Sequence, residues 1–410
     1  MTSDPTADAE QRWLTPGVGG IGAASLLSDM GHEVPTALLP SLLTTTLGAP
    51  ASALGLIEGL ADGLAGAARL GGGALADDPD RRRAVAVGGY TATAVLSGLI
   101  GTATAVWQVG VLRAGAWAAR GLRVPARNAL LADVVPANAY GRAYGFERAM
   151  DNLGAIGGPL LALGLVAAVG VRGAILASIV PGLLAALAIV YAVRHVRRPA
   201  VRQREPIRLR VRPVLAAGLG RLLAALAAFE VGNVAATLLI LRAGELLTPG
   251  HGQQAAAVLA LGCYTAYNLA ATLASVPAGR AADRRGPLGV LAAGVVLFMV
   301  AYAGLALTGA SLAVLAGCFV AAGVGIGCME TAEHAAVATA TPARLRGSAF
   351  GLLAAIQSVG NLAASGIAGL LWTWASPRVA FGYLAGWMVL ALVGLAGARQ
   401  VLAVRPWPGP

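Results

Sequence analysis

The stretch Gly73-Ala-Leu-Ala-Asp77 returns later in the sequence as Gly279-Arg-Ala-Ala-Asp283, at an offset of 206 residues. A second set of residues returns at the same offset. Pro136, Gly141, Ala143, Tyr144, Gly145 and Gly154 correspond to Pro342, Gly347, Ala349, Phe350, Gly351 and Gly360. A constant offset across separate motifs indicates that the chain consists of two repeats of similar fold.

The composition excludes an ordinary soluble protein. Hydrophobic residues make up 57% of the 410 residues and charged residues only 12%, and the mean hydropathy is +0.72. That charged fraction is about half of the usual value for a soluble domain. A lipid bilayer removes the need for a polar surface because its interior is itself apolar. The sequence therefore predicts an integral membrane protein.

Apolar runs of the length that crosses a bilayer, about 20 residues, recur along the chain. We expect an all-α membrane protein with twelve transmembrane helices in two six-helix pseudo-repeats. The predicted helices cover residues 17–47, 52–77, 84–104, 106–132, 141–168, 172–196, 213–245, 253–280, 287–308, 311–340, 346–373 and 378–402. The predicted regions are an N-terminal tail (1–16), a first bundle (17–196), a basic linker (197–212), a second bundle (213–403) and a C-terminal tail (404–410).

The positive charge lies mainly in the predicted loops, and this distribution does not indicate a surface that binds nucleic acid. The net charge is +11, and all basic residues are arginine. The densest group lies between Arg194 and Arg212, and most of the others fall between apolar runs on one predicted side of the membrane. Cytoplasmic loops carry such an excess. We expect a plasma (cytoplasmic, inner) membrane protein with both termini cytoplasmic and no nucleic-acid partner.

No cofactor or metal site is expected from the sequence. Cys263, Cys318 and Cys328 lie in apolar runs without metal-ligand spacing, and we expect no disulfide. The first 16 residues are polar and contain no basic segment followed by an apolar run, so no cleaved signal peptide is expected.

The stretch from Gly73 to Arg83 resembles the signature Gly-x-x-x-Asp-x-x-Gly-Arg-Arg, which the major facilitator superfamily carries between its second and third helices. The matching residues are Gly73, Asp77, Arg81 and Arg82 in the first copy, and Gly279, Asp283, Arg284 and Gly286 in the second. Asp80 stands where glycine is usual, and Pro287 replaces the first paired arginine of the second copy. The resemblance implies that these loop residues act in gating.

A fourth-helix motif extends the resemblance. Arg113, Gly121, Pro125 and Asp133 fall at the spacings of that superfamily. Stretches such as Ser28-Asp29-Met30, Gly121-Leu-Arg123 and Gly232-Asn233 resemble a bacterial subfamily of uncharacterised transporters. This resemblance covers nearly the whole chain, although Trp117 stands where arginine is expected. The resemblance implies a secondary transporter rather than an enzyme, with a small-molecule substrate between the two halves. It also implies a role in proton coupling for Arg113.

Ionisable residues inside the first two predicted helices mark a candidate site, because each is costly in lipid unless it faces a cavity or a partner. Asp29 and Glu33 lie four residues apart and share a helix face, as do Glu58 and Asp62. Pro35 should kink the first helix. Two carboxylates on one face of a kinked helix could hold a proton or a cation. The alternative is a purely structural network between the two helices.

The second half offers its own candidates. Glu230 and Asn233 lie early in the seventh predicted helix, and Glu330 and His334 share a face of the tenth. A Glu and a His could coordinate a divalent ion, but two ligands from one helix do not make a metal site. These residues are therefore assigned to the substrate cavity or to gating.

The repeat offset pairs residues of opposite character. Arg127 corresponds to Glu333, and Asn128 to His334. This predicts an ion-pair latch on the cytoplasmic side, with a plain structural bridge as the alternative. Asp151 is a further expected partner for the arginines of the fourth helix.

These observations favour a secondary active transporter that works as a monomer by alternating access, with protons as the coupling ion and export as the direction. Asp29, Glu33 and Arg113 are the expected coupling residues. The alternatives are a facilitator or uptake symporter, a divalent-metal exporter, and a membrane receptor that transports nothing.

Overall fold

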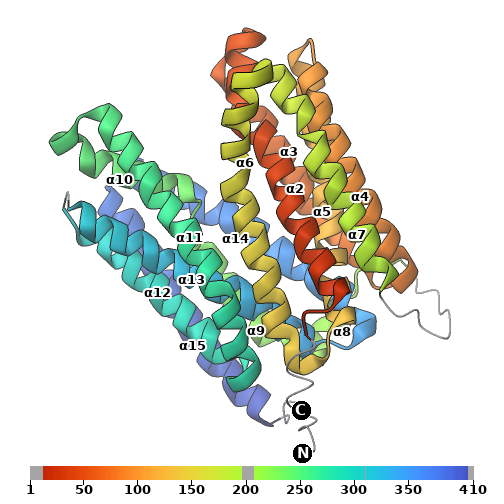
Figure 1. Cartoon of the computed structure of the whole chain (residues 1–410). Coiled ribbons are helices and arrows are strands. Elements are labelled where there is room, and N and C mark those ends of the chain that lie inside the picture. The colour runs from red at the N-terminus through yellow and green to blue at the C-terminus, as the bar shows by residue number, and fades with distance from the viewer. Residues whose placement is uncertain (1–12, 196–206, 310, 405–410) are drawn as a thin grey trace, which may run out of the picture. The chain divides into compact units, whose positions relative to one another are not determined.

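The structure, a computed structural model, describes residues 13–195, 207–309 and 311–404, and these ranges contain helices and no strand (Figure 1). The all-α prediction is therefore confirmed. Most of the predicted linker at 197–212, and most of both predicted tails, lie outside the described residues.

The α-helices follow in chain order as α2 (Pro16–Ser41), α3 (Ala51–Ala76), α4 (Pro79–Leu99), α5 (Val106–Val134), α6 (Tyr140–Ala177), α7 (Ile179–Arg194), α8 (Val211–Val214), α9 (Gly220–Gly232), α10 (Ala236–His251), α11 (Gln253–Arg285), α12 (Pro287–Leu307), α13 (Leu312–Ala340), α14 (Arg346–Trp374) and α15 (Pro377–Val404). Short 3₁₀ or π turns extend or join some of them: η1 (Leu42–Thr46), η2 (Ile100–Thr102), η3 (Ala137–Ala139), η4 (Leu215–Leu219) and η5 (Ala343–Leu345).

Eight stretches of the described residues are long and apolar enough to cross a membrane. The stretch Ala137–Arg194 contains both α6 and α7, and Gly220–His251 contains α9 and α10. Helices α2, α3 and α5 are outside this set, since charged residues lower their mean hydropathy. The exact number of twelve spans stays a prediction.

Two breaks interrupt the long helical stretches. Gly170 has a φ of +71°, which separates the two parts of α6 close to the boundary predicted between 168 and 172. The second break, between α9 and α10, interrupts the helix predicted at 213–245. Side chains replace the lost helical bonds there, because Asn361 donates to the Asn233 carbonyl at 3.0 Å and Ser365 accepts from the Ala235 N–H at 3.0 Å.

The chain divides into two compact units. The first comprises Met1–Ala139, Met150–Pro213 and Thr341–Ala355, and the second comprises Tyr140–Ala149, Val214–Ala340 and Ile356–Pro410. Within the first unit, α5 packs against α3 and α4, and α7 packs against α2 and α4 (Figure 1). Within the second, α13 packs against α11 and α12, and α15 against α9 and α12. The residue bounds predicted for the two bundles stay a prediction.

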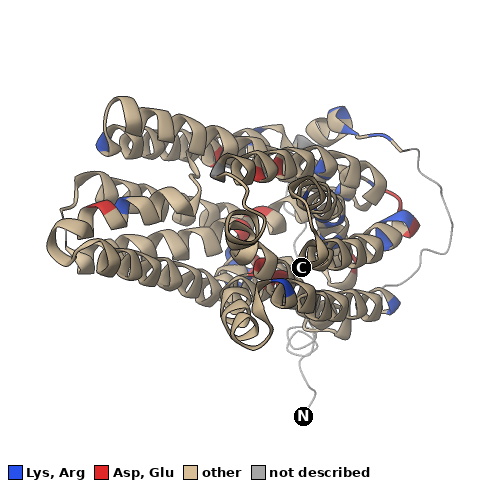
Figure 2. Ribbon diagram, turned by 90° about the horizontal axis from the view of Figure 1, so that it is seen from above, with Lys and Arg blue, Asp and Glu red and all other residues tan. Residues whose placement is uncertain are grey.

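Large apolar side chains are exposed on helices of both units. Leu163, Val359, Leu362 and Trp374 are each at least 68% exposed. Charged residues occupy few positions along the helices, as Figure 2 shows. So many exposed apolar side chains would be an aggregation hazard in water, whereas a bilayer accommodates them, so these surfaces are typical of a protein that lies in lipid.

Gly170 provides a test of the break in α6. Because its backbone conformation is accessible almost only to glycine, we predict that Gly170→Ala lowers the free energy of unfolding by about 1–3 kcal/mol. Gly164→Ala is the control, since Gly164 is helical and its added methyl group would meet nothing within 4 Å. Thermal unfolding in detergent measures both, and equal melting temperatures for the two variants would contradict the prediction.

Candidate functional site

Helix α2 carries three ionisable residues near its middle, Asp29, His32 and Glu33. The Thr15 hydroxyl caps the first turn, and the helix continues through Pro35 although proline has no N–H to donate. Asp29 and His32 are buried, whereas the Glu33 side chain is partly exposed.

His32 lies between the two carboxylates. Its Nδ1 is 2.9 Å from the Ser28 carbonyl oxygen, to which it donates, and 3.3 Å from Asp29 Oδ1. Its Nε2 is 3.4 Å from Glu33 Oε1. The imidazole ring is therefore within 3.4 Å of a carboxylate oxygen on each of the two acids.

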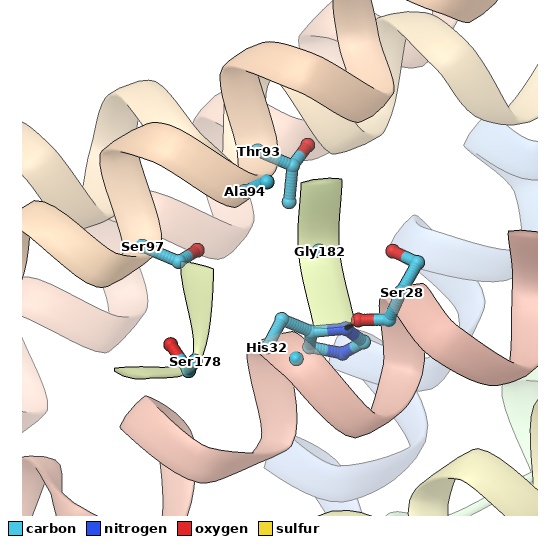
Figure 3. Close-up of a pocket in the computed structure, with 8 residues that line it drawn as sticks. Ser28, His32, Thr93, Ala94, Ser97, Ser178 and Gly182 are labelled. Carbon is cyan, nitrogen blue, oxygen red and sulfur yellow. Dashed lines mark hydrogen bonds between the residues drawn. The ribbon is translucent and has the colours of Figure 1, made fainter. Parts of the chain in front are cut away.

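A small cavity adjoins His32 between α2, α4 and α7 (Figure 3). Its volume is about 10 Å³, which is close to the room that one water molecule needs. The buried Ser97 hydroxyl, which lines it, has no hydrogen-bond partner within the described residues. Thr93 and Ser178 donate to backbone carbonyls and keep lone pairs that can accept. The cavity therefore has room for about one water molecule beside these hydroxyl groups.

Arg113 joins α2, α3 and α5. Its Nη2 lies 2.9 Å and 3.0 Å from the two carboxylate oxygens of Glu58, and its Nη1 donates to the Thr36 hydroxyl at 3.1 Å. The guanidinium carbon lies 3.4 Å from the centre of the Trp117 ring, a cation–π contact. The arginine is 1% exposed, so these groups take the place of water around its charge.

Trp117 brings the remaining acid into the network. Its indole N–H donates to Asp62 Oδ1 at 2.9 Å, and its ring meets the His32 ring edge-on with the centroids 5.6 Å apart. On the same helix, Arg120 Nη2 lies 3.6 Å from Asp29 Oδ1. One continuous cluster therefore connects the candidate residues of α2, α3 and α5.

We call this group the α2 cluster; it comprises Asp29, His32, Glu33, Glu58, Asp62, Arg113, Trp117 and Arg120. Its four carboxylates face two guanidinium groups, so its net charge is −2 when His32 is neutral. The neighbouring Arg123 stacks on the Tyr90 ring at 3.9 Å, and counting it still leaves an excess of negative charge. Such an excess of negative charge attracts positively charged species.

Two glycines of α6 allow that helix to approach the α2 cluster. A Cβ at Gly158 would lie 2.4 Å from the Cβ of Glu33, and one at Gly154 would lie 2.7 Å from the Cβ of Asp29. Any side chain at these positions would force the helices apart. Small residues permit this close packing in membrane proteins.

The first copy of the loop motif anchors the start of α14. Asp77 accepts hydrogen bonds from the Ser348 N–H at 2.8 Å and from the Ser348 hydroxyl at 2.5 Å. A Cβ at Gly73 would lie 2.8 Å from the Cα of Gly351, so the backbones are in contact. Burial raises the pKa of the Asp77 carboxyl, because desolvation penalises the charged form more than Ser348 and nearby arginines stabilise it.

The arginines of the first copy have separate partners. Arg82 forms an ion pair with Asp133 and donates to the Ala76 carbonyl at 2.7 Å. Arg81 lies 3.8 Å from Asp78. Arg82 thus connects the end of α3 with the end of α5.

The second copy repeats the arrangement at the start of α6. Asp283 accepts from the Gly141 N–H at 2.6 Å, from the Arg142 N–H at 3.0 Å and from Arg142 Nε at 2.9 Å. A Cβ at Gly279 would lie 2.2 Å from the Gly141 carbonyl oxygen. Arg284 forms no ion pair with another described residue. In both copies the aspartate binds the first N–H groups of a helix, where the helix dipole favours negative charge.

The remaining candidates of the second unit lie on α9, directly after its end, and on α13. Asn233 donates to Glu230 at 3.1 Å, and Glu330 lies 3.8 Å from an Arg148 guanidinium nitrogen. Glu333 accepts from the side chain of Gln357 at 2.6 Å.

The predicted latch residues each have a partner inside their own unit. Arg127 lies 3.5 Å from Asp151 and donates to Ser25 at 3.1 Å. His334 Nδ1 lies 2.6 Å from the Glu330 carbonyl oxygen. A latch between Arg127 and the residues of α13 stays a prediction.

Comparison with known proteins settles the family. The family model described as Major Facilitator Superfamily matches residues 21–263 and 250–406. The chain belongs to the Major Facilitator Superfamily. An uncharacterized MFS-type transporter of Methanocaldococcus jannaschii is 27% identical over 376 residues, 91% of this chain and 92% of the relative. An uncharacterized protein of Mycobacterium tuberculosis is 30% identical over 344 residues, 82% and 81% of the two chains.

Solved structures of transporters share the superfamily fold. A bacterial homologue of the iron transporter ferroportin, in an outward-facing state, aligns with a TM-score of 0.73 and 16% identity over 94% of this chain and 99% of its own. The human organic anion transporter MFSD10 aligns with a TM-score of 0.70 and 18% identity over 93% and 99%. These likenesses show the fold, and the superfamily places this chain among membrane transporters rather than enzymes.

Sequence reasoning missed several residues of this superfamily member. Trp117 stands where the resemblance predicts arginine. Its indole nevertheless binds Asp62 and lies against the Arg113 guanidinium group. Neither the role of Thr36 nor the position of His32 between two acids is predicted by the sequence pattern. The spacing of Arg113, Trp117 and Arg120 on one helix face was the available signal.

The ion pair of Arg113 and Glu58 gives a second test. We predict that Arg113→Gln lowers the free energy of unfolding by about 3 kcal/mol, the lower end of the range for a broken buried pair, because Glu58 is about a third exposed. The double variant with Glu58→Gln should recover part of this loss, since neither charge then lacks a partner. A double-mutant cycle by detergent unfolding measures the coupling, and strictly additive losses would contradict it.

Asp77 gives a third test. We predict that Asp77→Ala lowers the free energy of unfolding by about 1–3 kcal/mol, because it leaves the buried Ser348 N–H without an acceptor. Asp77→Asn should cost less, since the amide keeps an acceptor and removes a partly desolvated charge. Asp80→Ala, at a side chain that is 53% exposed, is the control. Equal losses for Asp77→Asn and Asp77→Ala would show that the charge itself is required.

Proposed function

We propose that the protein is a proton-coupled exporter of a small, positively charged molecule. The observation that carries the proposal is the α2 cluster, in which four carboxylates face two arginines and a histidine lies between two of the acids. A group of this charge binds either protons or a cation. If protons and the cation bind in turn to the same carboxylates, a proton gradient directed into the cell drives the cation out.

Asp29 and Glu33 are the proposed exchange sites, and His32 passes protons between them. Arg113 holds Glu58 and Trp117 in place. A movement of Arg113 would change how readily the neighbouring acids are protonated. Alternating access follows from the two sequence repeats, whose halves rock about a substrate site near the middle of the membrane. The loop aspartates, Asp77 and Asp283, hold and release the starts of α14 and α6 during that movement.

The proposal includes a location in the plasma membrane, with both termini cytoplasmic and the monomer as the working unit. The distribution of arginine in the sequence supports the orientation. A receptor without transport activity has less support, because a scaffold has no need for ionisable residues within its helices. Among the described residues, no group of three or more His, Cys, Asp or Glu side chains is placed to hold a metal ion, so export of divalent metals gains no support. No observation favours uptake or facilitated diffusion over export.

The fourth test measures transport in everted membrane vesicles with an imposed pH gradient. The panel contains lipophilic cations such as tetraphenylphosphonium, together with sugars, organic acids and divalent metals. We predict that a cation collapses the gradient in vesicles with the protein and not in empty-vector vesicles. Asp29→Asn and Glu33→Gln should abolish the collapse, because neither amide can exchange a proton.

The matched control is Glu245→Gln, which neutralises a carboxylate that is 41% exposed and lies in the second unit. It should leave the collapse unchanged. Exchange of labelled for unlabelled cation at equal pH shows whether the variants still bind and move substrate. Undiminished collapse in both Asp29→Asn and Glu33→Gln would contradict the assigned residues, and no collapse with any compound would contradict proton-coupled export.

A further inference from the structure

Glu333 is a buried acid of the second unit with an unsatisfied oxygen. The residue lies on α13 and is 1% exposed. Its Oε1 accepts from Gln357 Nε2 at 2.6 Å, whereas its Oε2 is buried and has no hydrogen-bond partner in the described part of the chain. A buried carboxylate without compensating bonds is far more costly than a neutral acid.

The charges around Glu333 do not compensate it. Glu330 on α13 and Glu230 on α9 both oppose a further negative charge there. Arg148 on α6 is the nearby cation, and it makes two bonds to Glu147, at 2.7 Å and 2.9 Å. Its charge is therefore already matched by the Glu147 carboxylate.

The remaining polar groups near Glu333 are neutral or donate elsewhere. His334 Nδ1 lies 2.6 Å from the Glu330 carbonyl oxygen and 3.6 Å from Glu333 Oε1, so its hydrogen bond goes to the backbone. The His334 ring lies against the Tyr144 ring of α6 at a tilt of 35°, with the centroids 5.5 Å apart. Helix α11 contributes the half-buried Tyr267, which is near Glu330 and Glu230. Even a protonated His334 would leave more carboxylates than cations.

Glu333 is also connected to the break between α9 and α10. Gln357 and Asn361 lie one turn apart on α14, and they bind Glu333 and the Asn233 carbonyl respectively. Gly360, between them, lies so close to α9 that its Cβ would be 2.4 Å from that of Glu230. One face of α14 thus contacts both the buried acid and the interrupted helix.

We propose that Glu333 is protonated at neutral pH and is a second proton-carrying site, separate from the α2 cluster. Its role in transport rests on the proposed proton-coupled export. The proton is released when the α9–α10 break and α14 move and give Oε2 a polar neighbour or water, and it returns when the acid is buried again. No bond other than the O–H bond forms or breaks.

The fifth test uses infrared spectroscopy of the purified full-length protein in detergent at neutral pH. The carbonyl stretching band of a protonated carboxylic acid should be present in the wild type and lose intensity in Glu333→Gln. It should remain in the control Glu245→Gln. An unchanged band in Glu333→Gln, or no such band in the wild type, would overturn the proposal. Should Glu333→Gln fail to fold, Gln357→Leu replaces it: loss of the hydrogen-bond donor should shift the band in frequency, and an unshifted band would overturn the proposal.

The vesicle assay separates this inference from the proposed function. We expect tetraphenylphosphonium, or whichever cation of the panel is active, to collapse less of the pH gradient in Glu333→Gln vesicles than in the wild type, with labelled-cation exchange retained. Wild-type activity with an undiminished collapse in Glu333→Gln would overturn the carrier role of Glu333. Absence of collapse in the wild type would instead contradict proton-coupled export, and the infrared band alone would then decide whether Glu333 is protonated.

Discussion

The cost of an ionisable side chain in lipid is the constraint on which the rest of this structure depends. Helices α2, α3 and α5 accept charged residues only because these residues face one another. Arg113 exemplifies the solution, since its guanidinium group is enclosed by Glu58, Thr36 and Trp117. The compensation is incomplete, because the α2 cluster keeps an excess of negative charge, and this excess is what the proposed coupling proton or cationic substrate would neutralise.

In both units a glycine allows one helix to pack closely against an acidic residue of another. Glycine of α6, at Gly154, allows contact with Asp29 on α2, and glycine of α14, at Gly360, allows contact with Glu230 on α9. These two glycines are related by the sequence repeat. The loop aspartates, Asp77 and Asp283, are related in the same way, and each binds N–H groups at the start of a helix. The repeat therefore preserves backbone contacts, while the ionisable side chains that it carries differ between the units.

Much of the fold could be predicted from sequence because composition and the 206-residue offset depend on many residues at once. The correspondence of Asp77 and Asp283 could be predicted from the same offset, and these motif residues led to the resemblance to the superfamily. The break at Asn233 could not be predicted, since the side chains that replace its helical bonds come from α14, far away in sequence. The placing of His32 between two acids likewise depends on rotamers and on packing against Trp117, which local spacing does not determine.

The central claim is that the α2 cluster holds an exchangeable proton. The most direct test counts the protons that purified, detergent-solubilised protein releases into unbuffered solution as the pH is raised from slightly acidic to slightly alkaline, with an indicator dye as the reporter. The double variant His32→Asn, Glu33→Gln is the comparison. The account predicts that the wild type releases at least one proton more than the variant. Equal numbers of released protons would contradict it.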